Sequence, residues 1–122
     1  MYSGSIIFFL LIFSIALILT ISYFFNIFPN RKSGLKDLYS EGLDMLIAGR
    51  RKLAYKNFKE IVAKDTNSVK AYIRLGQIMR ESGSPEQALK IHKNLTLRKN
   101  LTYYDNLEIK KNLVLDYYQL SK

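Results

Sequence analysis

The sequence predicts an all-α protein, with one N-terminal transmembrane helix followed by about two and a half helical hairpins. Three observations predict this fold class. Residues 6–28 contain no charged side chain. The segment after them matches itself at an offset of 34 residues. Glycines stand where each hairpin should turn. Helices are therefore expected at about 6–28, 34–48, 51–64, 68–82, 85–97 and 103–121.

The first element is a membrane anchor. At about 1.5 Å rise per residue, residues 6–28 form a helix of roughly 34 Å, enough to cross a hydrocarbon core of about 30 Å. A cleaved secretory signal is the alternative, but it needs a basic start, a shorter apolar core and small residues before the cleavage site. Residues 1–5 carry no charge, and bulky Tyr23 and Phe24 end the apolar run. An uncleaved helix with a short extracytoplasmic N-terminus is expected.

Charge next to the anchor predicts its orientation. Arg31, Lys32 and Lys36 follow the apolar run closely, and basic residues flanking a membrane helix stay on the cytoplasmic side. The remaining chain is therefore expected in the cytoplasm. Its lack of cysteine excludes disulfides and thiolate metal sites, and it agrees with a reducing compartment.

The chain has 19 Lys and Arg against 10 Asp and Glu, a net charge of +9. Basic side chains gain free energy beside an anionic leaflet, so the lipid bilayer is an expected partner. The alternative is that lysine-rich helices are simply soluble. The charges are scattered rather than clustered, which disfavours nucleic acid as a partner.

The segment after a linker at 29–34 contains two copies of one helix–turn–helix unit, at 35–68 and 69–102. Small Gly42 and Gly76 should let the paired helices approach closely, with Ala54 and Ala88 opposite them. The matched pairs are Leu38 with Tyr72, Gly42 with Gly76, Met45 with Met79, Gly49 with Gly83, Ala54 with Ala88, Phe58 with His92 and Ile61 with Leu95.

Turn and cap residues support these boundaries. Gly49 and Gly83 are expected in the left-handed conformation that ends many helices. Ser84 followed by Pro85 and then Gln87 predicts a capping box with proline in the first helical position. The other expected N-caps are Asn67 or Ser68 and Thr102.

Residues 103–122 predict one further helix, which is either a capping helix or part of a third repeat. An array needs a terminal helix to cover its last apolar face. The residues expected on that helix's apolar face are Leu107, Leu113, Leu115, Tyr117 and Leu120.

A small residue at position 8 and alanine at position 20 of both copies resemble the tetratricopeptide repeat. The sequence departs from that pattern at His92, where an aromatic residue is usual. It also departs at Thr66 and Asn100, where proline is usual.

A more specific resemblance covers nearly the whole chain. It is similar to the N-terminal part of the lipopolysaccharide assembly protein B family, which combines one membrane helix with cytoplasmic tetratricopeptide repeats. The residues that carry the likeness are Leu75, Gly76, Arg80, Gly83, Ala88, Ile91, His92, Asn94 and Leu95.

This resemblance implies a bacterial inner-membrane adaptor rather than an enzyme. Members of that family restrain lipopolysaccharide synthesis by helping a membrane-bound AAA protease degrade the deacetylase that commits precursors to lipid A. The family continues through further repeats to a rubredoxin-like zinc module. This sequence, having no cysteine, contains no such module. The rival hypothesis is a general assembly scaffold for another membrane complex, such as secretion or pilus machinery.

No catalytic arrangement is recognisable, and no cofactor or metal is expected. His92 is the only histidine, and it is expected as a packed core residue with one hydrogen-bond partner. Binding in a groove lined by the first helix of each hairpin is expected instead. An apolar floor with cationic flanks suits a peptide of acidic character. The alternative is that Leu43, Leu46 and Ile47 pack against the membrane-proximal linker or against a helix beyond those expected here. The expected groove residues are Lys36, Tyr39, Leu43, Leu46, Lys70, Ile73, Gln77 and Arg80.

Overall fold

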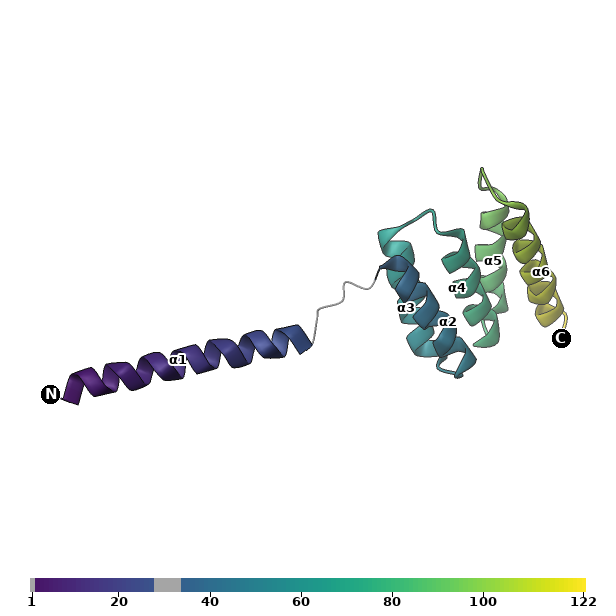
Figure 1. Cartoon of the computed structure of the whole chain (residues 1–122). Coiled ribbons are helices and arrows are strands. Elements are labelled where there is room, and N and C mark those ends of the chain that lie inside the picture. Colours follow the sequence, from purple (N-terminus) through teal and green to yellow (C-terminus); the bar gives the residue numbers. More distant parts are fainter. Residues whose placement is uncertain (1, 28–33) are drawn as a thin grey trace. The chain divides into compact units, whose positions relative to one another are not determined.

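The computed structural model describes residues 2–27 and 34–122, and all the regular secondary structure in those two ranges is helical (Figure 1). The chain divides into two compact units, 1–32 and 33–122, which are described separately. The expected linker at 29–34 lies outside the described residues except for Gly34, and so does residue 28, the last residue of the expected anchor.

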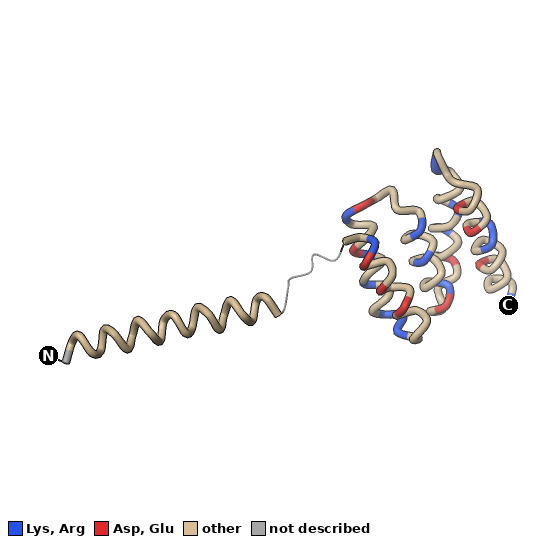
Figure 2. The backbone as a smooth tube through the Cα atoms, viewed as in Figure 1, with Lys and Arg blue, Asp and Glu red and all other residues tan. Residues whose placement is uncertain are grey.

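The first unit holds one helix, α1 (Tyr2–Ile27). Its segment Ser3–Ile27 has a mean hydropathy of 2.8, and no part of it is buried. In Figure 2 the coloured charged residues begin only after this helix. The hydroxyls of Ser14 and Thr20 donate to carbonyl oxygens one turn back, each at 2.8 Å, so these polar groups are satisfied within the helix. The helix is long and apolar enough to span a membrane.

The second unit contains five helices that pack as successive hairpins. The first pair packs together, the second pair packs on the first, and the last helix contacts both members of the second pair. This all-helical arrangement confirms the expected fold class, and each helix in this unit begins and ends within one residue of its expected bounds. The helices are α2 (Leu35–Ile47), α3 (Arg51–Lys64), α4 (Val69–Glu81), α5 (Pro85–Thr96) and α6 (Tyr103–Leu120).

Close packing inside each hairpin depends on glycine, although not on the contact expected from the sequence. A Cβ on Gly42 would lie 2.8 Å from Cζ of Phe58, so the aromatic ring faces the glycine. The expected partner Ala54 is also fully buried, but it is not among the nearest atoms to Gly42. In the second hairpin the ring of His92 occupies the equivalent place against Gly76.

Both hairpins turn in the same way. Gly49 has φ of 76° and Gly83 has φ of 91°, as expected for the left-handed conformation at a helix end. The amide of Arg50 donates to Met45 at 2.8 Å, and the amide of Ser84 donates to Met79 at 2.9 Å. The internal repeat is therefore reproduced in the backbone hydrogen bonds of the turns.

The expected caps are confirmed in one case and wrong in two. Thr102 accepts from the amide of Asp105 at 3.0 Å, and the Asp105 carboxylate accepts from the amide of Thr102 at 3.3 Å. Ser84 and Ser68 make no side-chain cap, although Pro85 does begin α5. Their ψ angles of 62° and 87°, against 161° at Thr102, turn the hydroxyl away from the helix amides.

The buried face of α6 differs from the expected one. The helix buries Ile109 together with two polar residues, Asn112 and Asp116. Of the five expected apolar residues, only Leu113 is half-buried. The other four, Leu107, Leu115, Tyr117 and Leu120, are 51, 39, 50 and 37% exposed.

Candidate partner-binding groove

Three of the expected groove residues lie around one hollow. Lys36 and Tyr39 come from α2, and Lys70 comes from α4. The hollow encloses about 540 Å³. Lys36 and Lys70 are equivalent positions of the two repeats, so the internal repeat predicts that they lie on neighbouring first helices. The other lining residues are Leu35, Asp37, Ser40, Ile61, Asp65 and Ser68.

A smaller hollow of about 170 Å³ extends the groove toward α6. Tyr39, Lys70 and Ile73 line it together with Arg74, whose Nε lies 3.4 Å from the hydroxyl oxygen of Tyr39. Arg74 and the contribution of α6 are not among the groove residues expected from the sequence. The signal available was that α6 occupies the place of a third first helix, so its first turns should also face the groove. The α6 residues are Tyr104, Asp105 and Glu108.

Four other expected groove residues make contacts within the fold. Ile73 is only 3% exposed and packs with Leu95 and Ile109, because α6 lies against α4. Leu43 and Leu46 pack against a core cluster formed by α2, α3 and α4, which is neither the open groove nor the expected alternative, while Ile47 is 86% exposed. Gln77 is held by Arg74 and Glu81 of its own helix, at 2.9 and 3.0 Å.

Arg80, the eighth expected groove residue, forms part of a buried charge cluster. Its Nη1 donates to Oδ1 of Asp116 at 2.8 Å and to Oδ1 of Asn112 at 3.2 Å. The side chain of Arg80 is 11% exposed and that of Asp116 is fully buried. Arg80 therefore fixes α6 to α4 instead of lining an open surface.

His92 completes the cluster with two partners rather than the single one expected. Its Nδ1 lies 2.5 Å from Oδ2 of Asp116, and its Nε2 lies 3.2 Å from the carbonyl oxygen of Ile73. His92 and Asp116 are both fully buried. The carboxylate thus has a partner on each oxygen, which is the condition for tolerating a buried charge.

The charge of the groove is mixed. Lys36, Lys70 and Arg74 supply positive charge, but carboxylates line the same two hollows. The sequence pattern predicts cationic flanks only, whereas α2, the α3–α4 turn and α6 contribute carboxylates to the same hollows. The groove is therefore suited to a polar peptide that carries both signs of charge, and acidic character alone is not favoured. The carboxylates belong to Asp37, Asp65, Asp105 and Glu108.

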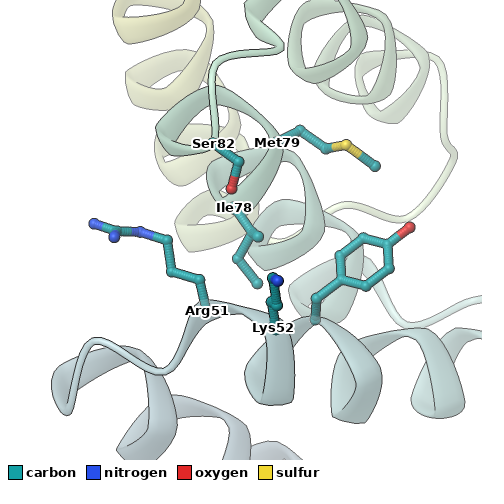
Figure 3. A pocket seen from close by; sticks show the side chains of 6 residues that line it. Arg51, Lys52, Ile78, Met79 and Ser82 are labelled. Atoms are coloured by element: carbon teal, nitrogen blue, oxygen red, sulfur yellow. The ribbon is translucent and has the colours of Figure 1, made fainter.

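A third hollow of about 310 Å³ lies between α3 and α4, where Ile78 and Met79 supply apolar surface (Figure 3). The guanidinium of Arg51 points away from it in Figure 3, and its Nε donates to Glu81 at 3.0 Å. Burial raises the pKa of the Glu81 carboxyl. Hydrogen bonds from Gln77 and Arg51 and the charges of Arg51 and Arg80 outweigh that effect, so its pKa lies below its ordinary value.

Within residues 2–27 and 34–122, no group of three or more His, Cys, Asp or Glu side chains is placed to hold a metal ion. No protein-family model matches the sequence, and a search of curated proteins also finds no match.

Proposed function

We propose that this protein is a membrane-anchored adaptor, which holds partner proteins at the cytoplasmic face of a bacterial inner membrane. The observation that carries the proposal is the combination of α1, an uncharged helix of membrane-spanning length, with a unit of stacked hairpins whose first helices line a groove. Hairpin stacks of this kind bind extended or helical peptides along such surfaces.

The proposed repeat type is the tetratricopeptide repeat. It is supported by the two glycines that accept a large side chain from the second helix, Gly42 and Gly76. It is also supported by the matching positive-φ turns at Gly49 and Gly83. The repeats then span 35–68 and 69–102, with α6 as the first helix of a further unit or as a cap.

The proposed pathway is regulation of lipopolysaccharide synthesis, with a membrane-bound AAA protease and its deacetylase substrate as partners. Its support is the likeness of residues 75–95 to the lipopolysaccharide assembly protein B family. Depletion of the protein should then raise the amount of the deacetylase in the cell. The alternative is a scaffold for secretion or pilus machinery. Unchanged deacetylase, with secretion or pilus components crosslinked to the groove, would favour that alternative.

Groove binding is tested by a charge reversal and its matched control. Lys70→Glu alters an exposed residue that lines both hollows. Lys59→Glu makes the same change on an exposed position of α3 outside the groove. Crosslinking in membranes should lose the partner with Lys70→Glu and keep it with Lys59→Glu. Equal recovery with both variants contradicts the groove as the binding site.

Orientation is tested through the lack of cysteine in the natural sequence. Ser3→Cys and Ser121→Cys each introduce a single thiol at an exposed position near one end of the chain. A membrane-impermeant maleimide should label the first variant in intact spheroplasts, and the second only after the membrane is permeabilised. The reverse pattern contradicts the proposed orientation.

A further inference from the structure

The surface of α6 that faces away from the other helices is unusual in composition. We define the outer face of α6 as Tyr103, Leu107, Lys110, Lys111, Val114 and Tyr118, all of which are exposed. Their spacings of three, four and seven place them on one side of the helix. The opposite side carries the buried residues of α6. Large apolar residues thus lie on the exposed side of α6, whereas two of its three buried residues are polar, which explains why its core face was not apparent from the sequence.

The outer face carries positive charge and no acid. All three acidic residues of α6, Asp105, Glu108 and Asp116, are buried or half-buried on other sides of the helix. Glu108 lies 3.7 Å from Nζ of Lys111, but the Lys111 side chain remains 64% exposed. The face therefore presents two lysines to a partner without a competing carboxylate among its own residues.

Its apolar residues are large and exposed. Tyr103 is 85% exposed, Val114 is 67% exposed and Tyr118 is 61% exposed. The ammonium of Lys122 lies 4.8 Å from the ring centroid of Tyr118, so the same combination of aromatic ring and cation continues to the end of the helix. An apolar surface of this kind, bordered by polar groups, marks an interaction site.

We propose that the outer face of α6 binds the headgroup region of an anionic lipid bilayer. Tyrosine prefers that region because its ring is apolar and its hydroxyl is polar. Lysine buries its alkyl chain there and keeps its ammonium among the lipid phosphates. A helix lying in the interface with leucine, valine, tyrosine and lysine on one face is the expected form of such a contact.

A second copy of the chain fits this surface less well than lipid does. Two outer faces packed together would bring Lys110 and Lys111 of one copy against those of the other, with no acid in either face to offset them. An anionic leaflet supplies the opposite charge, at roughly 1 kcal/mol per cation near the surface. Charge complementarity therefore favours an anionic bilayer over a second copy of the chain as the partner of the outer face.

The proposed function already brings this unit to a bilayer. In that proposal α1 spans the membrane, and the hairpin unit is covalently joined to α1. This connection raises the effective lipid concentration at α6. The contact is distinct from the groove and adds to the proposed adaptor function.

The test uses the full-length protein in liposomes, with a single indole as the reporter. The chain has no tryptophan, so Tyr118→Trp gives a unique signal on the outer face. Leu53→Trp, at a position of α3 that is 47% exposed, is the control. With brominated phosphatidylcholine and phosphatidylglycerol, the indole at position 118 should be quenched and the one at position 53 should not. Quenching should weaken in liposomes of phosphatidylcholine alone and at high salt.

Charge reversal on the Tyr118→Trp background separates lipid binding from general electrostatics. Lys110→Glu with Lys111→Glu should weaken the contact roughly fivefold or more per lysine. Lys56→Glu with Lys59→Glu makes the same change in net charge on exposed positions of α3 and should leave quenching intact. Val114→Asn, which changes no charge, should also reduce quenching. Unchanged circular dichroism establishes that each variant is folded.

Three results would overturn the proposal. Equal quenching at positions 118 and 53 would mean that the outer face has no preference for lipid. A blue shift at position 118 that depends on the protein-to-lipid ratio would assign the face to a second copy. An unquenched indole in anionic liposomes, together with crosslinking of position 118 to a protein in cells, would assign it to a protein partner.

Discussion

His92 and Asp116 form a fully buried pair that joins α5 to α6, with Nδ1 of the imidazole 2.5 Å from Oδ2 of the carboxylate. Arg80 of α4 binds the other carboxylate oxygen at 2.8 Å. One carboxylate therefore connects three helices. Among the described residues, no buried side-chain nitrogen or oxygen is left without a hydrogen-bond partner, so the cluster is complete as built.

Asp116→Ala should destabilise the second unit by about 3–5 kcal/mol, because it leaves the side chains of His92 and Arg80 buried without their partner. Urea denaturation of the detergent-solubilised protein, followed by far-ultraviolet circular dichroism, measures this loss. Asp37→Ala, at an exposed position in the first turn of α2, is the control and should cost far less.

A fully apolar replacement of the cluster should recover much of that stability. The triple variant Asp116→Leu, His92→Phe and Arg80→Met replaces all three polar side chains with apolar ones of similar volume, and such replacements of buried ion pairs are often neutral or stabilising. The first hairpin already packs Phe58 at the equivalent place. If the triple variant proved as unstable as Asp116→Ala, packing rather than unpaired charge would be the cause.

Gly42→Ala and Gly76→Ala should each destabilise the fold by about 1–3 kcal/mol through overpacking. Alanine would otherwise favour a helix by about 1 kcal/mol over glycine. Gly4→Ala, where no atom lies within 4 Å of the new Cβ, should leave the unfolding of the second unit unchanged. Denaturation midpoints measure all three variants.

Second-site substitutions should have different effects at Gly42 and Gly76, because the side chains that face the two glycines differ. Phe58→Leu should partly rescue Gly42→Ala, because a smaller side chain makes room. His92→Leu should fail to rescue Gly76→Ala, because it removes a hydrogen-bond partner of Asp116. Rescue in both cases would indicate that the His92 hydrogen bonds contribute little to stability.

The fold was predictable from the sequence because its signals are local or periodic. The turns at Gly49 and Gly83 need a residue that tolerates positive φ, and the repeat placed both at the same offset. The groove side chains of Lys36, Tyr39 and Lys70 followed from that repeat. The apolar run of α1 identified the membrane-spanning candidate by length alone.

The contacts of α6 were not predictable because they join residues that are far apart in the sequence and follow no periodic pattern. Asp116 is a charged residue in a helix with exposed leucines, so the hydrophobic pattern gives no indication that it is buried. Its burial depends on His92 and Arg80, which are 24 and 36 residues away along the chain. The same packing of α6 against α4 explains why Arg80 does not line the open groove and why Ile73 is only 3% exposed.

Thr102→Ala should cost about 1 kcal/mol by removing the side-chain acceptor for the Asp105 amide. Thr102→Ser keeps the hydroxyl and should retain most of the stability. Hydrogen exchange of the first turn of α6 reports this change directly, with faster exchange expected only for the alanine variant. Equal exchange in both variants would contradict a role for the hydroxyl.

Glu81→Gln should reduce stability at neutral pH by less than about 1 kcal/mol, because Arg51 and Glu81 are partly exposed. The folded-state pKa of Glu81 lies below its ordinary value. Its contribution is therefore present above the unfolded-state pKa and is lost as the pH falls through the folded-state pKa. Denaturation of the wild type and Glu81→Gln from neutral to acidic pH should give curves that converge in acid.

A double-mutant cycle with Arg51→Gln tests whether the guanidinium is responsible. The coupling between positions 51 and 81 should be measurable at neutral pH and vanish in acid. A coupling that persisted in acid would point to the uncharged hydrogen bonds of the pair.

Asp116 of α6 contacts both helices of the second hairpin, so the stability of that hairpin depends on α6. A protease that cut within the loop before Thr102 and released α6 would remove the carboxylate partner of His92 and Arg80 in the preceding hairpin. Proteolytic removal of α6 should therefore unfold the second hairpin, α4 and α5, instead of leaving it folded without α6.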